Sequence, residues 1–248
     1  MTAFKDHFST VADDYARYRP TYSPALAARL AEVCRRHRCA FDVGCGTGQL
    51  SVLLAYHFDL VRATDASERQ IAAAKRHAQV VYACETAEQI GAHDGSADLI
   101  VAAQAAHWFD RPRFYAECRR IGSQGAVIAL VTYGIPRLDG APGRVVADYH
   151  GRDLKPYWPA ERCDVVSGYR DFGFPFAEIG VSTPAIIRNW RLQDLLGYLR
   201  TWSAVRQAEA SGAIDMITTA ERRLTAAWGE ASERRTVTWP VSMRVGRL

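Results

Sequence analysis

A glycine-rich stretch near the beginning of the chain constrains the fold more than any other feature. Residues 42–49 have the sequence DVGCGTGQ; they follow a short apolar run and precede leucines at helical spacing. This order predicts a strand, a tight loop and a helix. Glycines in such a loop allow positive φ angles and a close approach to a ligand, and the helix N-terminus presents backbone N–H groups. We therefore expect a nucleotide-like ligand beside this loop.

The residues around the loop narrow the class of ligand. A dinucleotide fingerprint needs a small residue where Gln49 stands, which disfavours a nicotinamide oxidoreductase, and the absence of a Gly-Lys-Ser or Gly-Lys-Thr sequence excludes a P-loop. Asp65 closes the second predicted strand, where a carboxylate can accept hydrogen bonds from both ribose hydroxyls. Asp42 precedes the glycines, where its carboxylate can bond the loop amides or face an ammonium group. Together they indicate an adenosine-containing cofactor without a pyrophosphate.

Strands and helices alternate through the first half of the chain. Strands are predicted at 40–43, 59–64, 80–84, 97–103 and 126–133, and helices at 24–37, from Leu50 onward, at 67–78 and at 113–121. This alternation predicts an α/β fold with a doubly wound, mostly parallel sheet and helices on both faces. Ligands bind such sheets at the carboxyl ends of the strands.

The second half has a different character. Residues 136–175 are rich in glycine, proline and aromatic residues and show no clear period; strands are predicted at 176–181, 186–190 and 236–245, and helices at 192–210 and 215–231. We expect one domain over residues 1–248. It would comprise an N-terminal lid (1–23), a cofactor-binding core (24–136), cap insertions (137–175 and 192–231) and a last strand (232–248).

Composition excludes several classes of protein. With 48% hydrophobic and 23% charged residues in 248, the chain is typical of a folded globular protein. A net charge of +4 is too small and dispersed to indicate a nucleic-acid partner. The six cysteines form no C-x-x-C pair, which argues against zinc sites and disulfides and favours a cytoplasmic protein. We expect no export signal, no membrane anchor and no metal.

Further runs of residues extend the pattern of the glycine loop. They are Tyr15, Tyr18, Arg19 and Pro20, Thr86-Ala87-Glu88, the run from Gln104 to Asp110, Tyr157-Trp158-Pro159, Gly168-Tyr169-Arg170 and Thr201-Trp202-Ser203. With the loop, these runs resemble the class I S-adenosylmethionine-dependent methyltransferases of the type 11 small-molecule group, and within it the proteins similar to trans-aconitate methyltransferase. The resemblance implies a Rossmann-like, seven-stranded sheet with an antiparallel last strand and a helical cap.

The resemblance also implies a binding site for S-adenosylmethionine and its product S-adenosylhomocysteine. The glycines cradle the methionine moiety, Asp65 binds the ribose, Ala66 lies along the adenine, and Gln104 lines the methyl region. Many relatives have an aspartate where Thr86 stands, so Thr86, the backbone of Ala87 or the carboxylate of Glu88 must contact the adenine. The expected cofactor-binding residues are Asp42, Gly44, Cys45, Gly46, Gly48, Gln49, Asp65, Ala66, Thr86, Ala87, Glu88, Gln104, Tyr15 and Arg19.

The expected reaction is methyl transfer to a small-molecule acceptor, at a carboxylate or another oxygen. His107 follows the fourth predicted strand and is either a general base or part of the pocket wall. Candidate acceptor-binding residues are Trp108, Tyr157, Tyr169 and Arg170, since arginine makes paired bonds with carboxylates. The alternative is a non-catalytic regulatory protein that binds S-adenosylmethionine or S-adenosylhomocysteine. The oligomeric state is not indicated.

Overall fold

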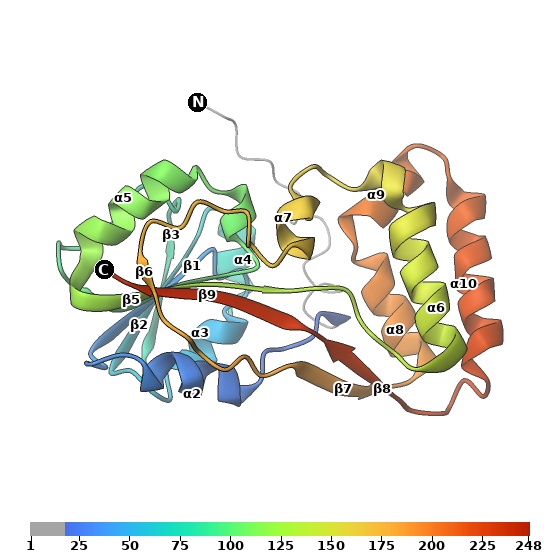
Figure 1. Cartoon of the computed structure of the whole chain (residues 1–248), viewed down its shortest axis with the longest axis horizontal. Coiled ribbons are helices and arrows are strands. Elements are labelled where there is room, and N and C mark those ends of the chain that lie inside the picture. The colour runs from blue at the N-terminus through green and yellow to red at the C-terminus, as the bar shows by residue number, and fades with distance from the viewer. Residues whose placement is uncertain (1–17) are drawn as a thin grey trace.

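The computed structural model describes residues 18–248, and a seven-stranded sheet forms its centre (Figure 1). The strand order is β3-β2-β1-β4-β5-β9-β6. The strands are β1 (Cys39–Val43), β2 (Leu60–Asp65), β3 (Val80–Cys84), β4 (Ala97–Ala103), β5 (Gly122–Tyr133), β6 (Ala177–Glu178) and β9 (Val241–Arg247). The first five are parallel, whereas β9 runs antiparallel to β5 and to β6. The predicted fold class is therefore confirmed.

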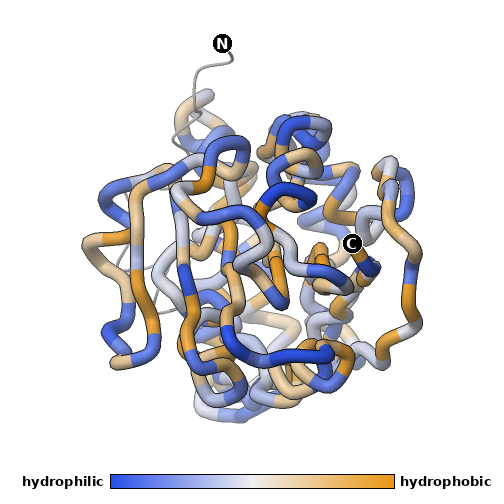
Figure 2. The backbone as a smooth tube through the Cα atoms, turned by 90° about the vertical axis from the view of Figure 1, so that its left-hand side faces the viewer, coloured by the Kyte–Doolittle hydropathy of each residue, from blue (hydrophilic) through white to orange (hydrophobic). Residues whose placement is uncertain are grey.

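Side chains that alternate along the strands build two apolar layers. Leu99 and Val101 of β4 pack in one cluster with α2 (Pro24–Glu32) and α3 (Gln49–Leu54). Ile100 of β4 belongs to the opposite cluster, with Phe114 of α5 (Arg111–Ile121). Because both faces are covered, the strands are almost continuously apolar. Figure 2 shows the distribution of hydrophobic and hydrophilic residues along the backbone.

Two of the predicted helices are shorter than expected. The helix predicted at 24–37 begins as predicted, with the Ser23 hydroxyl accepting from the Ala25 N–H at 3.3 Å, but α2 ends at Glu32. The helix predicted at 67–78 is reduced to α4 (Glu68–Ala72). Beyond it the Lys75 N–H donates to the carbonyl of Thr47 at 3.1 Å, so the chain is tied to the glycine loop and leaves the helical path.

The helical cap lies beside the sheet, at the right of Figure 1. It contains α6 (Gly140–Asp148), α8 (Leu192–Arg200), α9 (Ser203–Ala210) and α10 (Ile214–Trp228). The single helix predicted at 192–210 is wrong, because Trp202 adopts an extended conformation and separates α8 from α9. The predicted last strand is also split, since Pro240 lies between β8 (Arg235–Trp239) and β9, and β8 pairs with β7 (Ile186–Trp190) in a separate sheet.

The stretch without a clear period, 136–175, divides between the cap and the sheet. It forms α6, the π-helical turn η2 (Tyr149–Asp153), the 3₁₀ turn η3 (Lys155–Tyr157) and α7 (Arg162–Val166). Helix α6 packs against α10 in the cap. Helix α7 instead packs against β5, and Val165, Tyr169 and Phe172 are buried in the same cluster as Phe114. Thus α7 lies between the sheet and the cap (Figure 1).

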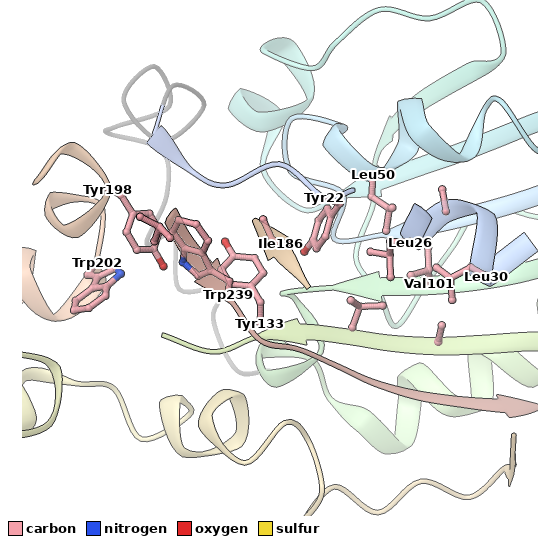
Figure 3. Close-up of a cluster of buried hydrophobic side chains, with 14 of the residues drawn as sticks. Tyr22, Leu26, Leu30, Leu50, Val101, Tyr133, Ile186, Tyr198, Trp202 and Trp239 are labelled. Atoms are coloured by element: carbon pink, nitrogen blue, oxygen red, sulfur yellow. The ribbon is translucent and has the colours of Figure 1, made fainter. Parts of the chain in front are cut away.

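Aromatic side chains connect the sheet with the cap. Figure 3 shows Tyr133 of β5, Trp239 of β8, and Tyr198 and Trp202 of the cap following one another across the junction. The Tyr198 ring lies 5.4 Å from that of Trp239 and 5.8 Å from that of Trp202, both edge-on. The cap is therefore fixed to the sheet by a continuous apolar core. Over residues 18–248, no helix combines the length and the apolar character needed to cross a membrane.

Candidate active site

The glycine loop lies at the carboxyl end of β1, between this strand and α3. The N–H groups of Gly44 and Cys45 donate to the carbonyl of Thr64 at 2.8 and 2.9 Å. Gly44, Gly46 and Gly48 have φ angles of 71°, 55° and 75°. A Cβ atom at Gly44 would lie 2.5 Å from Cβ of Ala105, so the loop requires glycine there.

Asp65 fixes the loop against the end of β2. Its Oδ2 accepts a hydrogen bond from the Gly46 N–H at 2.9 Å, and its Oδ1 accepts one from the Ser67 N–H at 2.9 Å. Ala66 lies next to it and is half-buried, and its carbonyl accepts from the Cys84 thiol at 3.6 Å. The acidic side chain expected to bind a ribose therefore also organises the loop beside it.

Asp42 is buried under the loop with only part of its hydrogen-bonding capacity used. The residue is only 1% exposed, and the Ser51 hydroxyl of α3 donates to its Oδ2 at 2.6 Å. Oδ1 is buried without a hydrogen-bond partner among the described residues. Burial raises the pKa of Asp42 to about 7; the nearby charge of Asp65 adds to the rise, and the Ser51 hydrogen bond opposes it.

Two more buried oxygen atoms around the loop lack partners within residues 18–248. They are Oγ1 of Thr64, whose carbonyl holds the loop, and Oε1 of Gln70 in α4. A Cβ atom built on Gly46 would have Gln70 Oε1 as its contact, at 3.8 Å, so the middle of the loop is open. Buried oxygen atoms without partners are costly unless a ligand donates to them. The loop is therefore suited to a ligand with hydrogen-bond donors or positive charge.

Gln104, just beyond β4, combines backbone strain with a side-chain amide that is hydrogen-bonded at both ends. Its φ angle is 57°, an unusual value for a residue other than glycine. Its Nε2 donates to the carbonyl of Tyr133 at 3.0 Å, and its Oε1 accepts from the Thr132 hydroxyl at 3.1 Å. Strained residues held by such contacts are concentrated at ligand-binding sites. The end of β5 thus fixes Gln104 close to the loop side of the sheet.

His107 lies in the short 3₁₀ turn η1 (Ala106–Trp108) and is paired with Tyr169. Its Nδ1 is 2.8 Å from the Tyr169 hydroxyl, and its ring is 4.7 Å from that of Trp108. Burial lowers the pKa of His107 to about 3, and the positive charges of Arg162 and Arg19 lower it further. The imidazole is therefore neutral at physiological pH.

Similarity to known proteins decides the family of this chain. A model of the methyltransferase domain matches residues 41–130. A Dictyostelium discoideum protein provisionally described as a methyltransferase is 31% identical over 220 residues, covering 87% of this chain and 84% of that protein. The chain belongs to the methyltransferase family.

Solved structures of other methyltransferases support this assignment. A protein from Anaeromyxobacter dehalogenans, provisionally described as a type II methyltransferase, has a TM-score of 0.87 and 44% identity over 93% of this chain and 98% of its own. A Bacillus halodurans protein provisionally described as a methyltransferase has a TM-score of 0.51 and 18% identity over 90% of this chain and 98% of its own, which shows the shared fold alone.

The residues expected near adenine in this methyltransferase lie in a turn after β3. Thr86 is exposed and Ala87 is buried. The carboxylate of Glu88 accepts a hydrogen bond from the Asp110 N–H at 2.9 Å, so Glu88 ties this turn to the beginning of α5. A contact to adenine from Thr86 or from the backbone of Ala87 is compatible with the structure, whereas the Glu88 carboxylate already accepts a backbone hydrogen bond.

Cys45 lies within the glycine loop of this methyltransferase and Gln49 directly follows it, and neither carries a reactive group. Burial raises the pKa of the Cys45 thiol far above its ordinary value, and the charges of Asp42 and Asp65 raise it further, so the thiol stays protonated. Its Sγ contacts the Gly46 carbonyl at 3.5 Å. Gln49 is the first residue of α3 and is half-buried. Both form part of the wall of the loop.

The candidate residues of the N-terminal segment are only partly described. Tyr15 lies outside the described residues. Arg19 is half-buried at the junction of sheet and cap, where Nη1 donates to the Tyr133 hydroxyl at 3.3 Å and Nη2 to the carbonyl of Thr201 at 3.4 Å. Its charge acts on His107, which places the guanidinium near the expected methyl-transfer region.

The four candidate acceptor-binding residues do not share one position. Tyr169 is fully buried against His107, and Trp108 adjoins the same imidazole. Tyr157, at the end of η3, packs against the apolar cluster that the cap shares with the sheet. Arg170 is exposed, and its Nε donates to the carbonyl of Ser167 at 3.0 Å. The structure thus brings Tyr169 and Trp108 together with His107 and separates Arg170 from them.

Arg162 is a site residue that sequence reasoning missed. It begins α7, its charge acts on His107, and its Cζ lies 4.7 Å from the centre of the Trp158 ring. It occurs in a segment without helical or strand periodicity, so no pattern separates it from the many exposed arginines. The one signal in the sequence that could have singled out Arg162 is its nearness to Trp158. The described residues contain no group of His, Cys, Asp or Glu that could hold a metal.

Proposed function

We propose that this methyltransferase transfers a methyl group from S-adenosylmethionine to a carboxylate, or another oxygen, of a small organic acid. When bound, this cofactor supplies a methyl group already activated on a sulfonium. The protein must therefore bind a cation with an ammonium group and a ribose, and hold an oxygen nucleophile in line with the methyl group. The oxygen gains the methyl group as the sulfur–carbon bond breaks, and the bonding electrons stay on sulfur.

The loop region fits such a cofactor. The buried Oδ1 of Asp42 and Oε1 of Gln70 need donors, which an ammonium group provides. The open middle of the loop at Gly46 leaves room for a ligand, and the carboxylates of Asp42 and Asp65 make the region negative. We assign the ribose to Asp65, adenine to Ala66, Thr86 and the backbone of Ala87, and the methyl region to Gln104.

The pairing of His107 Nδ1 with the Tyr169 hydroxyl at 2.8 Å, together with the low pKa of the imidazole, supports the proposal for the acceptor. A pKa of about 3 makes His107 a poor proton acceptor, because burial and two arginines disfavour the imidazolium. A carboxylate acceptor is already ionised and needs no base. The same arginines attract a carboxylate and repel a cationic acceptor. His107 is thus proposed to position the acceptor rather than to remove a proton.

The remaining expectations from the sequence stay part of this proposal. They are the type 11 small-molecule group, the likeness to trans-aconitate methyltransferase, a cytoplasmic location, and the absence of nucleic-acid and membrane partners. The division into a lid, a core, two cap insertions and a last strand is also part of this proposal.

Calorimetric titration with S-adenosylmethionine and S-adenosylhomocysteine tests the cofactor. We expect the wild type to bind both, and Asp65→Ala to bind at least tenfold more weakly. Asp59→Ala is the matched control, because Asp59 is an exposed aspartate that directly precedes the opposite end of β2. Failure of the wild type to bind either compound would contradict the proposal, and so would equal affinity in Asp65→Ala.

A second assay separates an enzyme from a binding protein. The wild type is incubated with S-adenosylmethionine and a panel of small carboxylic acids, and formation of S-adenosylhomocysteine and methyl ester is followed by mass spectrometry. We expect ester from at least one acid. Tight binding of S-adenosylhomocysteine without any ester from the panel would favour the regulatory alternative.

A further inference from the structure

The two edges of the seven-stranded sheet differ in how they are protected. At one edge, β6 is only two residues long, and its Glu178 forms an ion pair with Arg244 of β9. At the other edge, β3 has five residues, none of which is charged. Very short strands and charged side chains keep a sheet edge from pairing with another chain. The β6 edge has both forms of protection, whereas β3 has neither.

The backbone of β3 leaves alternate residues unpaired. In the parallel register with β2, the Val61 N–H donates to the carbonyl of Gln79 at 2.8 Å. The N–H and carbonyl groups of one residue in a parallel strand point to the same side, and successive residues alternate. Tyr82 and Cys84 therefore direct their backbone groups to the open side of the sheet. Among the described residues, β2 is the one strand that pairs with β3.

A groove of about 470 Å³ lies along this open edge, between β3 and the segment that contains α4. Its apolar lining consists of Ile71, Ala72, Val80, Val81 and Tyr82. Val81 is 51% exposed, although it belongs to the central sheet. An apolar groove beside unpaired strand backbone is suited to binding another strand.

Two opposite charges line the two ends of this groove. Glu68 begins α4 shortly after Asp65, which is in register with Cys84 at the carboxyl end of β3. Arg76 follows α4, where the chain returns to Val80 at the amino end of β3. Both charged side chains are exposed, and neither has an ion-pair partner within residues 18–248. The groove thus has a negative end and a positive end.

We propose that the β3 edge and its groove bind the same edge of a second copy of this chain, so that the protein is a two-fold symmetric dimer. A two-fold axis perpendicular to the sheet makes the two β3 strands antiparallel, and each contact between the copies then occurs twice. Glu68 of each copy meets Arg76 of the other. The backbone groups of Tyr82 and Cys84 pair across the axis and join the two sheets. A second copy is the occupant because this one surface carries both halves of its own complement.

The mass of the full chain in solution tests this surface. Sedimentation velocity over a wide range of protein concentrations is expected to show a dimer with twice the chain mass of 27.6 kDa. Arg76→Glu and Glu68→Arg each place like charges at both ends of the interface, so each is expected to weaken dimerisation at least tenfold. Arg113→Glu is the matched control, because it reverses a charge at an exposed position of α5, outside the groove. The control is expected to dimerise like the wild type.

A mixture of the two charge variants tests the antiparallel arrangement. When Arg76→Glu pairs with Glu68→Arg, the two substituted side chains attract each other at one end, and the native pair is kept at the other. The equimolar mixture is therefore expected to recover dimers with an affinity close to that of the wild type. This recovery also shows that both variants are folded. Weak dimerisation of each variant without recovery in the mixture would show that Glu68 and Arg76 do not meet, and would overturn the inference.

Hydrogen exchange locates the interface along the chain. Backbone amides of residues 80–85 are expected to exchange more slowly in the wild-type dimer than in Arg76→Glu at the same concentration. A wild type that stays monomeric would overturn the inference, and so would a dimer that tolerates both charge reversals. A dimer whose protection lies elsewhere in the chain would contradict it as well. The inference is independent of the proposed function, because none of these measurements uses the cofactor.

Discussion

The hydroxyl of Tyr169 lies 2.8 Å from Nδ1 of His107; Tyr169 is fully buried and His107 is half-buried. Tyr169 has a φ angle of 62°, so its backbone is strained like that of Gln104. The pKa of Tyr169 is raised, chiefly by burial, so the phenol stays protonated. A neutral, hydrogen-bonded pair therefore faces the expected acceptor region.

The titration of His107 is the first prediction. With a pKa of about 3, its ring signals are expected to stay constant from pH 9 down to pH 5, because burial and two arginines disfavour the charged form. The measurement is histidine ring NMR, in which His107→Asn assigns the signal by its disappearance. A midpoint of 6 or above for His107 would restore the general-base role.

The strain at Gln104 leads to a second prediction, made by comparing two substitutions. Gln104→Ala and Gln104→Gly remove the same side-chain hydrogen bonds to Tyr133 and Thr132. Only glycine tolerates a φ of 57° without penalty, so the glycine variant is expected to be more stable by about 1 kcal/mol. Urea denaturation checks this difference. Equal stabilities would show that the backbone relaxes in the alanine variant. Both variants are expected to lower the rate of methyl transfer.

The core of the fold could be predicted because its signals are local. The loop at 44–48 and the apolar runs at 80–84 and 97–103 define their own boundaries, and the structure confirms both strands. The boundaries that were missed depend on tertiary contacts. The bond from Lys75 to Thr47 shortens α4, and the packing of Trp202 at the junction divides a helix that sequence periodicity makes continuous.

The candidate site was predictable where backbone geometry defines it and less so elsewhere. Asp42 and Asp65 stand at fixed positions relative to β1 and β2, so a motif finds them. Arg162 and Arg170 look alike in sequence, since both are arginines among aromatic residues in a segment without periodicity. Only the three-dimensional structure shows that the first is half-buried beside Trp158 and the second is exposed.

Asp98 provides a third prediction, on stability. It is 3% exposed at the other end of the sheet from the glycine loop, and accepts from the Arg38 N–H at 3.0 Å, the Arg38 guanidinium at 3.2 Å and the Ser123 hydroxyl at 2.8 Å. Asp98→Ala is expected to cost about 2–4 kcal/mol, because the buried Ser123 hydroxyl and the Arg38 N–H lose their acceptor. Asp94→Ala is the control; its carboxylate is 81% exposed, and a change below about 0.5 kcal/mol is expected.

The contribution of Asp98 should also depend on pH. Burial raises its pKa, but the hydrogen bonds from Arg38 and Ser123 outweigh this effect and lower it below the ordinary value of 3.8. Its stabilising effect is thus complete above the ordinary pKa and is lost as the pH falls through the folded-state pKa. Denaturation of the wild type and Asp98→Ala between pH 7 and pH 2.5 should show the two stabilities converging. A constant difference would mean that packing, rather than the charge, matters.

The last prediction concerns Asp42→Asn, which is expected to have opposite effects on the stability of the protein and on its affinity for the cofactor. The folded pKa of Asp42 is about 7, above the ordinary 3.8, because the carboxyl is buried. The folded state therefore holds a proton that the unfolded state releases between these values, so the stability of the ligand-free wild type falls as the pH rises from 4 to 7. An amide carries no such charge. The asparagine variant should gain about 1–3 kcal/mol relative to the wild type at pH 8, and little at pH 4.

The same substitution is expected to weaken cofactor binding. The ammonium group proposed to meet Oδ1 would keep the carboxylate ionised, whereas the amide of the variant would present at most a neutral partner, so S-adenosylhomocysteine affinity should fall at least tenfold at pH 8. For the wild type, affinity should decline as the pH falls below 7, since the carboxyl must then lose a proton on binding. Thermal denaturation and calorimetry at pH 6 and pH 8 measure both effects. If the variant is more stable than the wild type but binds S-adenosylhomocysteine equally well, Asp42 does not contact the cofactor. The effect on stability would then still follow from the burial of its carboxylate.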